Sequence, residues 1–292
     1  MTGRERRRLD PMKGVWKVLE RRVDLVVSRF VYPHLLRLWN PYSGLLARRF
    51  SVAEISLSPS RWPRDLPPLR VLLLSDIHTG IFLRPEVLSD LLTSLVMLKP
   101  DLIAVAGDVV TGRSSDLDRF LDALHVLAQA PLGAWYCLGN HDYFGGDAEE
   151  VRRKLKSIGI ETLRNESVSV LHGNGHFVLG GIDDLILGTP DWPELLSQHG
   201  PPHLLLAHHP DFFYAAAAHG VPLTLSGHTH GGQIRLPGRP PIVRHSRFLL
   251  DEGAYAYRGS LLVVSRGLGS VGLPWRYGAD PEAVLLEIVP PR

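Results

Sequence analysis

Apolar residues recur at helical spacing near the start of the chain. From Met12 to Phe30 they fall at the i, i+3, i+4 and i+7 positions of one helix face, and lysine and arginine fill many of the positions between them. A second short apolar stretch, over residues 35–42, follows Pro33. The pattern predicts a basic amphipathic helical segment over residues 1–50. Such a segment either lies on an anionic membrane surface or docks its apolar face on the domain behind it.

The rest of the chain alternates short apolar runs with stretches of helical spacing. The apolar runs cover residues 71–75, 102–106, 134–138, 204–207 and 223–226. The helical stretches that separate several of them cover residues 84–98, 116–129 and 147–158. This order predicts an α/β domain whose central parallel strands are covered on both faces. We expect that domain to occupy residues 69–292, preceded by a strand and Pro-rich linker over residues 51–68.

Composition and charge narrow the function classes. The 292 residues are 45% hydrophobic and 21% charged, as in an ordinary globular protein. Residues 1–50 hold twelve Lys and Arg against four Asp and Glu, whereas the remainder holds 20 against 26. An acidic main domain disfavours long nucleic acids, so no nucleic-acid partner is expected. No apolar run reaches the roughly 18 residues of a spanning helix, and no signal-peptide pattern is present. The single cysteine, Cys137, favours a reducing compartment.

Each of the five apolar runs is followed by residues of types that can bind metals. The residues that follow the runs are, in chain order, Asp76 and His78, then Asp108, then Asn140 with His141 and Asp142, then His208 with His209, and finally His228 with His230. In open α/β sheets, ligands bind beyond the carboxyl ends of the strands, so these five segments should converge. Singly, each could be a turn, a cap or a buried histidine. Together, in this order at strand ends, they indicate a metal site.

The residue types also narrow the choice of metal. Carboxylate oxygens and imidazole nitrogens suit borderline divalent ions, Mn²⁺ first, with Fe²⁺ and Zn²⁺ as alternatives. The absence of cysteine at the site disfavours a structural zinc site built on thiolates. Seven candidate ligands exceed what one tetrahedral ion takes. We therefore expect two divalent metal ions.

The ordered set D-x-H, G-D, G-N-H-D, H and G-H-x-H resembles the calcineurin-like metallophosphoesterase superfamily over about residues 69–290. The resemblance implies a four-layer α/β fold, a two-sheet β sandwich flanked by helices, with two metals at the strand ends. It implies that one metal is held by Asp76, His78, Asp108 and His230, and that the other is held by Asp108, Asn140, His208 and His228. It also implies that His141 is the catalytic histidine and that Asp142 orients or tunes it.

Three further motifs resemble a bacterial membrane-associated branch that includes enzymes similar to UDP-2,3-diacylglucosamine pyrophosphatases. They are L-A-H-H-P-D-F-F, S-G-H-T-H-G-G-Q-I-R-L-P-G and the tail V-S-R-G-L-G-S-V-G-L-P-W-R. Members of the branch more often read A-H-N-P, so His209 departs from the common form, and His208 is the favoured ligand by its place in the motif. In the tail, Arg266 and Arg276 are expected to contact phosphate and lipid at the mouth of the site, the alternative being a turn with exposed charge.

These observations predict a dinuclear metal-dependent phosphohydrolase that cleaves a phosphodiester or pyrophosphate bond. The resemblance implies a lipid-linked or amphipathic substrate such as UDP-2,3-diacylglucosamine, a role in lipid A biosynthesis, and a peripheral position on the cytoplasmic face of the cell membrane. A soluble nucleotide phosphodiesterase is the alternative enzyme. A non-catalytic scaffold of the same fold is the alternative from another class, and such a protein should lack some of the ligands. The sequence indicates no protein partner.

Overall fold

The computed structural model describes residues 41–236 and 238–291. Pro41–Arg292 form one compact unit. The helix predicted from Met12 to Phe30 lies outside the described residues, so it stays a prediction. Among the described helices, none combines the length and the apolar character that crossing a bilayer requires.

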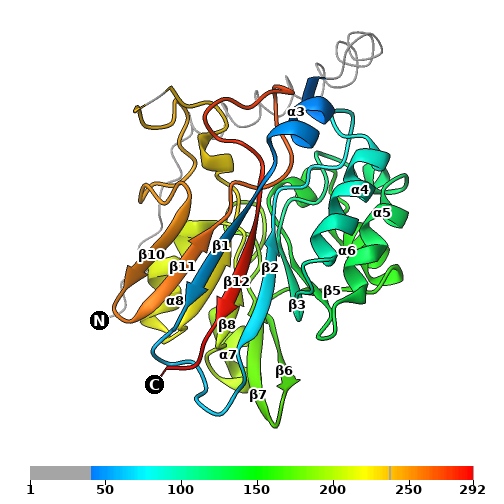
Figure 1. Ribbon diagram of the computed structural model, residues 1–292. Coiled ribbons are helices and arrows are strands. Elements are labelled where there is room, and N and C mark those ends of the chain that lie inside the picture. Colours follow the sequence, from blue (N-terminus) through cyan, green and yellow to red (C-terminus); the bar gives the residue numbers. More distant parts are fainter. Residues whose placement is uncertain (1–40, 237, 292) are drawn as a thin grey trace. The chain divides into compact units, whose positions relative to one another are not determined.

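Two six-stranded sheets form the centre of this unit (Figure 1). In sheet order, the first contains β1 (Ser51–Leu57), β12 (Glu282–Ile288), β2 (Leu69–Leu74), β3 (Leu102–Ala106), β4 (Ala134–Cys137) and β5 (Ile160–Leu163). In the same way, the second contains β10 (Gly253–Tyr257), β11 (Ser260–Val264), β9 (Leu223–Ser226), β8 (Leu204–Leu206), β7 (Gly175–Gly181) and β6 (Glu166–His172). Strands β2 to β5 are parallel, as are β7, β8, β9 and β11. The predicted α/β class is confirmed.

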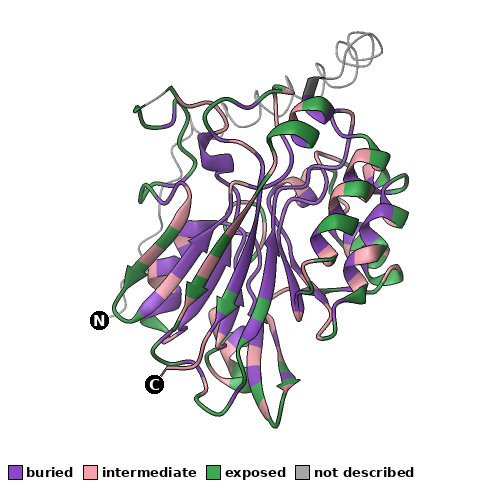
Figure 2. Ribbon diagram, in the orientation of Figure 1, coloured by how far each residue is buried: buried purple, intermediate pink, exposed green. Residues whose placement is uncertain are grey.

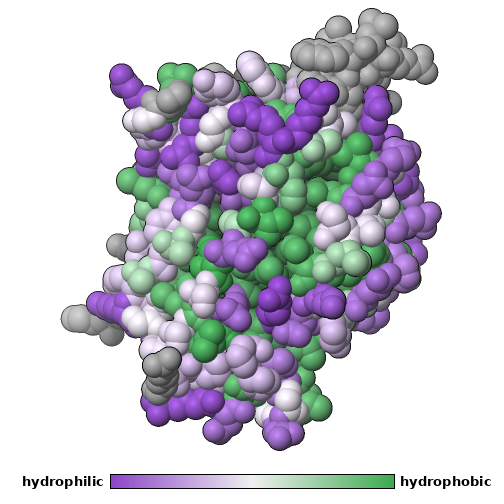
Figure 3. Space-filling model, in the orientation of Figure 1, coloured by the Kyte–Doolittle hydropathy of each residue, from purple (hydrophilic) through white to green (hydrophobic). Residues whose placement is uncertain are grey.

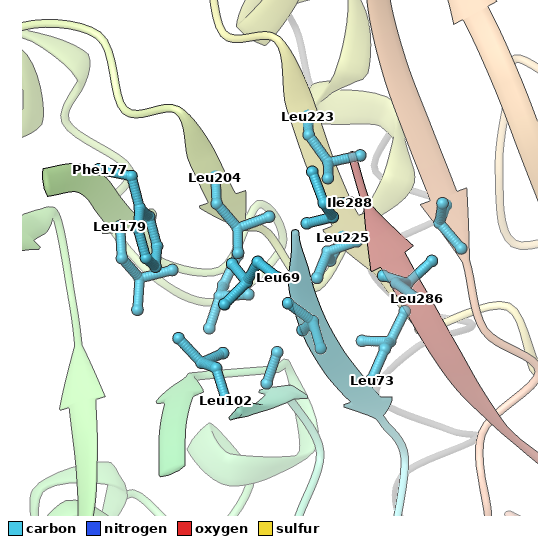
Figure 4. Packing of buried hydrophobic residues seen from close by; sticks show 14 of the residues in the cluster. Leu69, Leu73, Leu102, Phe177, Leu179, Leu204, Leu223, Leu225, Leu286 and Ile288 are labelled. Atoms are coloured by element: carbon cyan, nitrogen blue, oxygen red, sulfur yellow. The ribbon is translucent and has the colours of Figure 1, made fainter. Parts of the chain in front are cut away.

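The main core lies between the two sheets. In β2, the alternate residues Leu69, Val71 and Leu73 join a cluster with leucines of the second sheet, among them Leu204 and Leu225 (Figure 4). Because successive side chains of a strand point to opposite faces, the intervening residues of β2 lie on the other face of the sheet. They are fully buried where helices cover that face. Burial on both faces explains why the strands read as unbroken apolar runs.

Helices cover the outer faces of the sheets. On the side of the first sheet lie α4 (Pro85–Val96), α5 (Leu121–His125) and α6 (Ala148–Ser157), whose solvent sides are exposed (Figure 2). On the second sheet, α7 (Trp192–His199) and α8 (Phe213–Ala218) pack against the outward face of β8. The stretch predicted as one helix over residues 116–129 is divided between α5 and two 3₁₀ turns, η2 (Ser114–Leu117) and η3 (Val126–Gln129).

The segment before β2 is built into the domain. Strand β1 pairs in parallel with β12 along its whole length. In the Pro-rich stretch that follows, Trp62 and Leu66 are buried in the core between the sheets. Helix α3 (Pro41–Arg49) buries Tyr42 and Leu46, and the Tyr42 hydroxyl donates to the carbonyl of Leu268. The last part of the predicted 1–50 segment therefore docks on the domain.

Candidate metal centre

The seven predicted ligands meet at the carboxyl ends of β2, β3, β4, β8 and β9, at the upper end of the sheets in Figure 1. Their side chains are buried. Three groups have ligand atoms within 4.8 Å of one another: Asp76, His78 and His230; His78, Asp108 and His141; and Asp108, His208 and His228. The segments that the sequence predicted to converge are thus brought together.

The first group surrounds a point between two imidazoles. The Nε2 atoms of His78 and His230 lie 3.1 Å apart. Asp76 Oδ1 lies 3.4 Å from the Nε2 atom of His230. Asp108 Oδ2 lies 3.8 Å from the Nε2 atom of His78. Two imidazole nitrogens and the Asp76 carboxylate lie within 4.8 Å of one another, with Asp108 next to His78, and such donors suit a divalent cation.

Asp108 also belongs to the group that contains His208 and His228. The same Oδ2 atom lies 3.2 Å from His208 Nε2, which in turn lies 3.2 Å from His228 Nδ1. The Oδ1 atom of Asn140 is buried and has no hydrogen-bond partner. An unsatisfied buried amide oxygen is costly, and a cation at this position would satisfy it. The residues therefore fit two cations bridged by Asp108.

The backbone at the strand ends is held in an unusual conformation. Five of the candidate ligands have φ between +48° and +71°, namely Asp76, His78, Asp108, His228 and His230. Residues other than glycine enter this left-handed region at a cost of about 1–3 kcal/mol each, and they do so mainly at functional sites. The fold thus tolerates strain in order to direct these side chains inward.

Two glycines allow the close packing of the ligands. A Cβ atom at Gly139 would lie 2.2 Å from Asp108 Oδ1. At Gly107, where φ is +84°, a Cβ atom would lie 2.3 Å from His208 Nδ1. Any larger residue would displace the ligand beside it.

Burial sets the protonation of the site. It is the main cause that lowers the pKa of His78, His228 and His230 well below the usual value, so these imidazoles are neutral. For His208, burial alone would lower the pKa, but the charges of Asp108 and Asp76 raise it to about 10. Burial raises the pKa of Asp76 to about 6.

The structure distinguishes His208 from His209. The Nδ1 atom of His208 lies 2.7 Å from the carbonyl oxygen of Ala106. Since a carbonyl only accepts, Nδ1 carries a proton and Nε2 is the nitrogen that faces the cluster. The Nδ1 atom of His209 accepts instead from the amide of Asp211 at 3.2 Å and caps η5 (Pro210–Phe212). His208 is therefore the member of the pair that belongs to the cluster.

Comparison with known proteins agrees with this geometry. The calcineurin-like phosphoesterase family matches residues 69–232. The chain belongs to this family. It is 36% identical over 230 residues to the phosphodiesterase YaeI of Escherichia coli, covering 76% of this chain and 83% of that protein. It is 29% identical over 269 residues to the metallophosphoesterase YkuE of Bacillus subtilis, covering 89% and 88%. The protein is thus a phosphoester hydrolase.

In this calcineurin-like phosphoesterase, His141 is oriented by the backbone. Its amide donates to Asp108 Oδ1 at 2.8 Å. Its Nδ1 atom lies 2.7 Å from the carbonyl oxygen of Thr111 and must carry the proton there. The free Nε2 atom is left to act at the centre, where the ring packs edge-on against His78 at 4.7 Å between centroids.

Asp142 has a different role from the one expected. Its carboxylate accepts the backbone amides of Gly139 at 2.7 Å, Asp108 at 3.1 Å and Val109 at 3.2 Å, as well as the hydroxyl of Tyr136. Burial, and next the charge of Asp108, raise its pKa to about 7. These hydrogen-bond partners of the carboxylate do not include the His141 ring, so the expectation that Asp142 orients that ring directly is corrected, and its tuning of His141 stays a prediction. Asp142 joins the loops after β3 and β4. Tyr136 gave no signal of this role, because it lies within an apolar strand.

Arg276 does not lie at the mouth of the phosphoesterase site, because its side chain is fully buried. The guanidinium donates to the carbonyls of Gly269 and Arg266, each at 2.8 Å, and its Nη2 atom lies 2.9 Å from His230 Nδ1. A buried charge needs several such partners, and here they consume the donors that a substrate would use. The expected substrate contact is corrected to a support for the His230 ring.

Arg266 is nearer the surface but is already paired. Its Nη2 atom lies 2.6 Å from Glu282 Oε2, and its Nε atom lies 3.7 Å from Glu252 Oε2. Two carboxylates neutralise the single guanidinium. Its expected contact with substrate phosphate stays a prediction.

Proposed function

We propose that the protein hydrolyses a phosphodiester or pyrophosphate bond with a water activated by two divalent ions, Mn²⁺ first. Asp76, His78, Asp108 and His230 would hold one ion, and Asp108, Asn140, His208 and His228 the other. The observation that carries the proposal is the position of Asp108 Oδ2, which faces a histidine of each group at 3.8 Å and 3.2 Å. When bound, such ions would lower the pKa of water and neutralise phosphoryl oxygens.

The remaining chemistry belongs to residues of the chain. His141 would hold or deliver a proton at Nε2, either on a phosphoryl oxygen or on the departing oxygen. The carbonyl of Thr111 fixes its tautomer. Asp142 and the buried Tyr136 keep the loops after β3 and β4 in place, so that the ligands are positioned before substrate arrives.

We further propose a lipid-linked substrate, such as UDP-2,3-diacylglucosamine, at the inner face of the cell membrane. The support is the basic amphipathic pattern of residues 1–50 and the motifs around His208, His230 and Arg276. Flotation of the full chain with phosphatidylglycerol vesicles tests the membrane position. Failure of the protein to float would contradict it.

The substrate is tested by Mn²⁺-dependent release of UMP from UDP-2,3-diacylglucosamine, measured beside hydrolysis of bis-p-nitrophenyl phosphate. We expect both reactions, and we expect both to disappear on chelation and to return when Mn²⁺, but not Ca²⁺, is added. Comparison of Mn²⁺, Fe²⁺ and Zn²⁺ at equal occupancy ranks the metals. Turnover of bis-p-nitrophenyl phosphate alone would contradict the proposed lipid-linked substrate and favour a nucleotide phosphodiesterase. No turnover of either compound by the metal-loaded protein would contradict the proposed reaction.

A further inference from the structure

Exposed apolar side chains gather in two loops beside the metal centre. Among the described residues, eight of the thirteen exposed large hydrophobic side chains lie in residues 236–249 and 273–277. Six of them, between 41% and 65% exposed, are here called the loop rim: Leu236, Ile242, Val243, Leu273, Trp275 and Tyr277. Scattered apolar residues need no explanation, but a concentration of them on one surface indicates a partner.

Hydrogen bonds join the two loops into one surface. The side-chain amide of Gln233 donates to the carbonyl of Val271 at 2.9 Å, and its oxygen accepts the amide of Val271 at 3.1 Å. The amide of Tyr277 donates to Gln233 at 3.0 Å, and that of Arg235 donates to Tyr277 at 2.7 Å. The amide of Ile242 donates to the carbonyl of Ile234 at 3.3 Å, so the two ends of the first loop are also hydrogen-bonded to each other. These hydrogen bonds hold the two loops of the rim together as one ordered surface.

The rim is also attached to the metal centre. Gln233 follows the turn η6 (His230–Gly232), which carries the ligand His230. In the second loop, Arg276 is buried against His230, while its neighbours Trp275 and Tyr277 point to solvent. The same arrangement that supports the ligand thus presents aromatic side chains outward.

Arginines accompany the apolar side chains. Residues 233–249 contain four arginines and no acidic residue, in a part of the chain after residue 50 where acidic residues outnumber basic ones. Arg239 has no acidic partner among the described residues, and Arg247, 3.6 Å from Asp211, keeps a side chain that is 60% exposed. An open pocket of about 680 Å³ lies in this surface, with Arg49, Arg235 and Arg239 among its lining residues. Figure 3 shows hydrophobic and strongly hydrophilic residues mixed along the upper margin of the molecule.

We propose that the loop rim binds the surface of a membrane that contains anionic lipids. Arg235 and Arg244 pair with Glu252 and Asp251, so Arg239 and the exposed Arg247 are the arginines placed to contact lipid phosphates. Apolar and aromatic side chains beside such arginines suit the boundary between headgroups and acyl chains. A lipid headgroup would bind in the open pocket of this surface. The six residues of the loop rim lie outside residues 1–50 in the sequence, and the proposal does not depend on which phosphoester is hydrolysed.

The test uses the full chain with a fluorophore at single positions. The native Cys137 is buried, so a cysteine introduced at the surface can be labelled selectively with the environment-sensitive dye NBD. Labels at Ile242→Cys and Leu273→Cys should shift to the blue with phosphatidylglycerol vesicles and be quenched by nitroxide-bearing lipid. Matched labels at Met97→Cys and Leu171→Cys, which are 73% and 58% exposed in α4–β3 and β6, should not change.

A charge reversal gives a second measurement. Arg239→Glu should weaken vesicle binding by at least about fivefold, the contribution of one arginine at an anionic surface. Lys99→Glu makes the same change of net charge before β3 and should weaken it by less than about twofold, because its distance from the bilayer leaves it screened. Both effects should fade with added salt.

Three outcomes would overturn the proposal. Vesicle-bound protein with unchanged dye at positions 242 and 273 would show that residues 1–50 alone make the contact. Absence of vesicle binding would exclude both surfaces. A blue shift that rises with protein concentration in the absence of lipid would assign the rim to contact between copies of the chain. None of these results depends on whether the protein hydrolyses the proposed substrate.

Discussion

Asp108→Asn is expected to reduce kcat by at least about 10³-fold, because the shared carboxylate contributes several kcal/mol through the ions that it holds. Asparagine keeps the shape of the side chain and an oxygen that can accept the amide of His141. It removes the negative charge that faces His78 and His208. The measurement is turnover of bis-p-nitrophenyl phosphate together with metal content per chain. We expect fewer than two ions to remain.

Asp101→Asn is the matched control. Asp101 precedes β3, whereas Asp108 follows it, so the same substitution is made at the opposite end of one strand. Its carboxylate accepts the amide of Arg70 at 2.8 Å on an exposed surface. Activity and metal content should be unchanged. Two bound ions and normal turnover in Asp108→Asn, with contaminating hydrolase excluded, would remove Asp108 from the centre.

His141→Ala is expected to lower kcat by about 10²- to 10⁴-fold, the usual contribution of a positioned proton donor, while both metals stay bound. The distinction follows from the structure. The amide of residue 141 still reaches Asp108 Oδ1 after truncation, whereas the imidazole Nε2 atom is lost. Metal content, kcat and KM measured on the same preparation separate a chemical role from a binding role.

His125→Ala controls for the loss of an imidazole. The Nδ1 atom of His125 also lies against a backbone carbonyl, that of Ile158, at 3.0 Å, but on the exposed side of the domain. It should keep full activity. A drop to one metal in His141→Ala would make His141 a ligand, which its position within 4.8 Å of His78 and Asp108 atoms allows, and would contradict the proposed role.

The sequence predicted the central strands and the residues that meet at their ends. Both predictions depended on local signals, since strands buried on two faces must be apolar and the ligands follow them directly. A strand was predicted within residues 51–68, where β1 lies, but its pairing with β12 left no such signal, because the two strands are far apart in the sequence. The buried Trp62 and Leu66 were hidden within a Pro-rich stretch that reads as a linker.

The roles of individual side chains were harder to predict than their proximity. Arg276 was expected at the surface because arginine is rarely buried, and only the fold shows the carbonyls that receive its donors. Asp142 follows His141 in sequence, yet its carboxylate faces the amides of neighbouring loops. The left-handed backbone of Asp76 or Asp108 could not be foreseen, since few such residues adopt it.

The place of β12 in the first sheet affects how the protein is made on the ribosome. Strand β12 begins at residue 282, yet it lies between β1 and β2, which end at residues 57 and 74. Those two strands therefore leave the ribosome early, and they lack the strand that pairs with both of them until the intervening residues and β12 have been synthesised. Nascent chains that stop short of β12 present two unpaired edges to chaperones, and pairings so distant in sequence form slowly. Loading of metal into a stable site should accordingly follow, rather than accompany, translation.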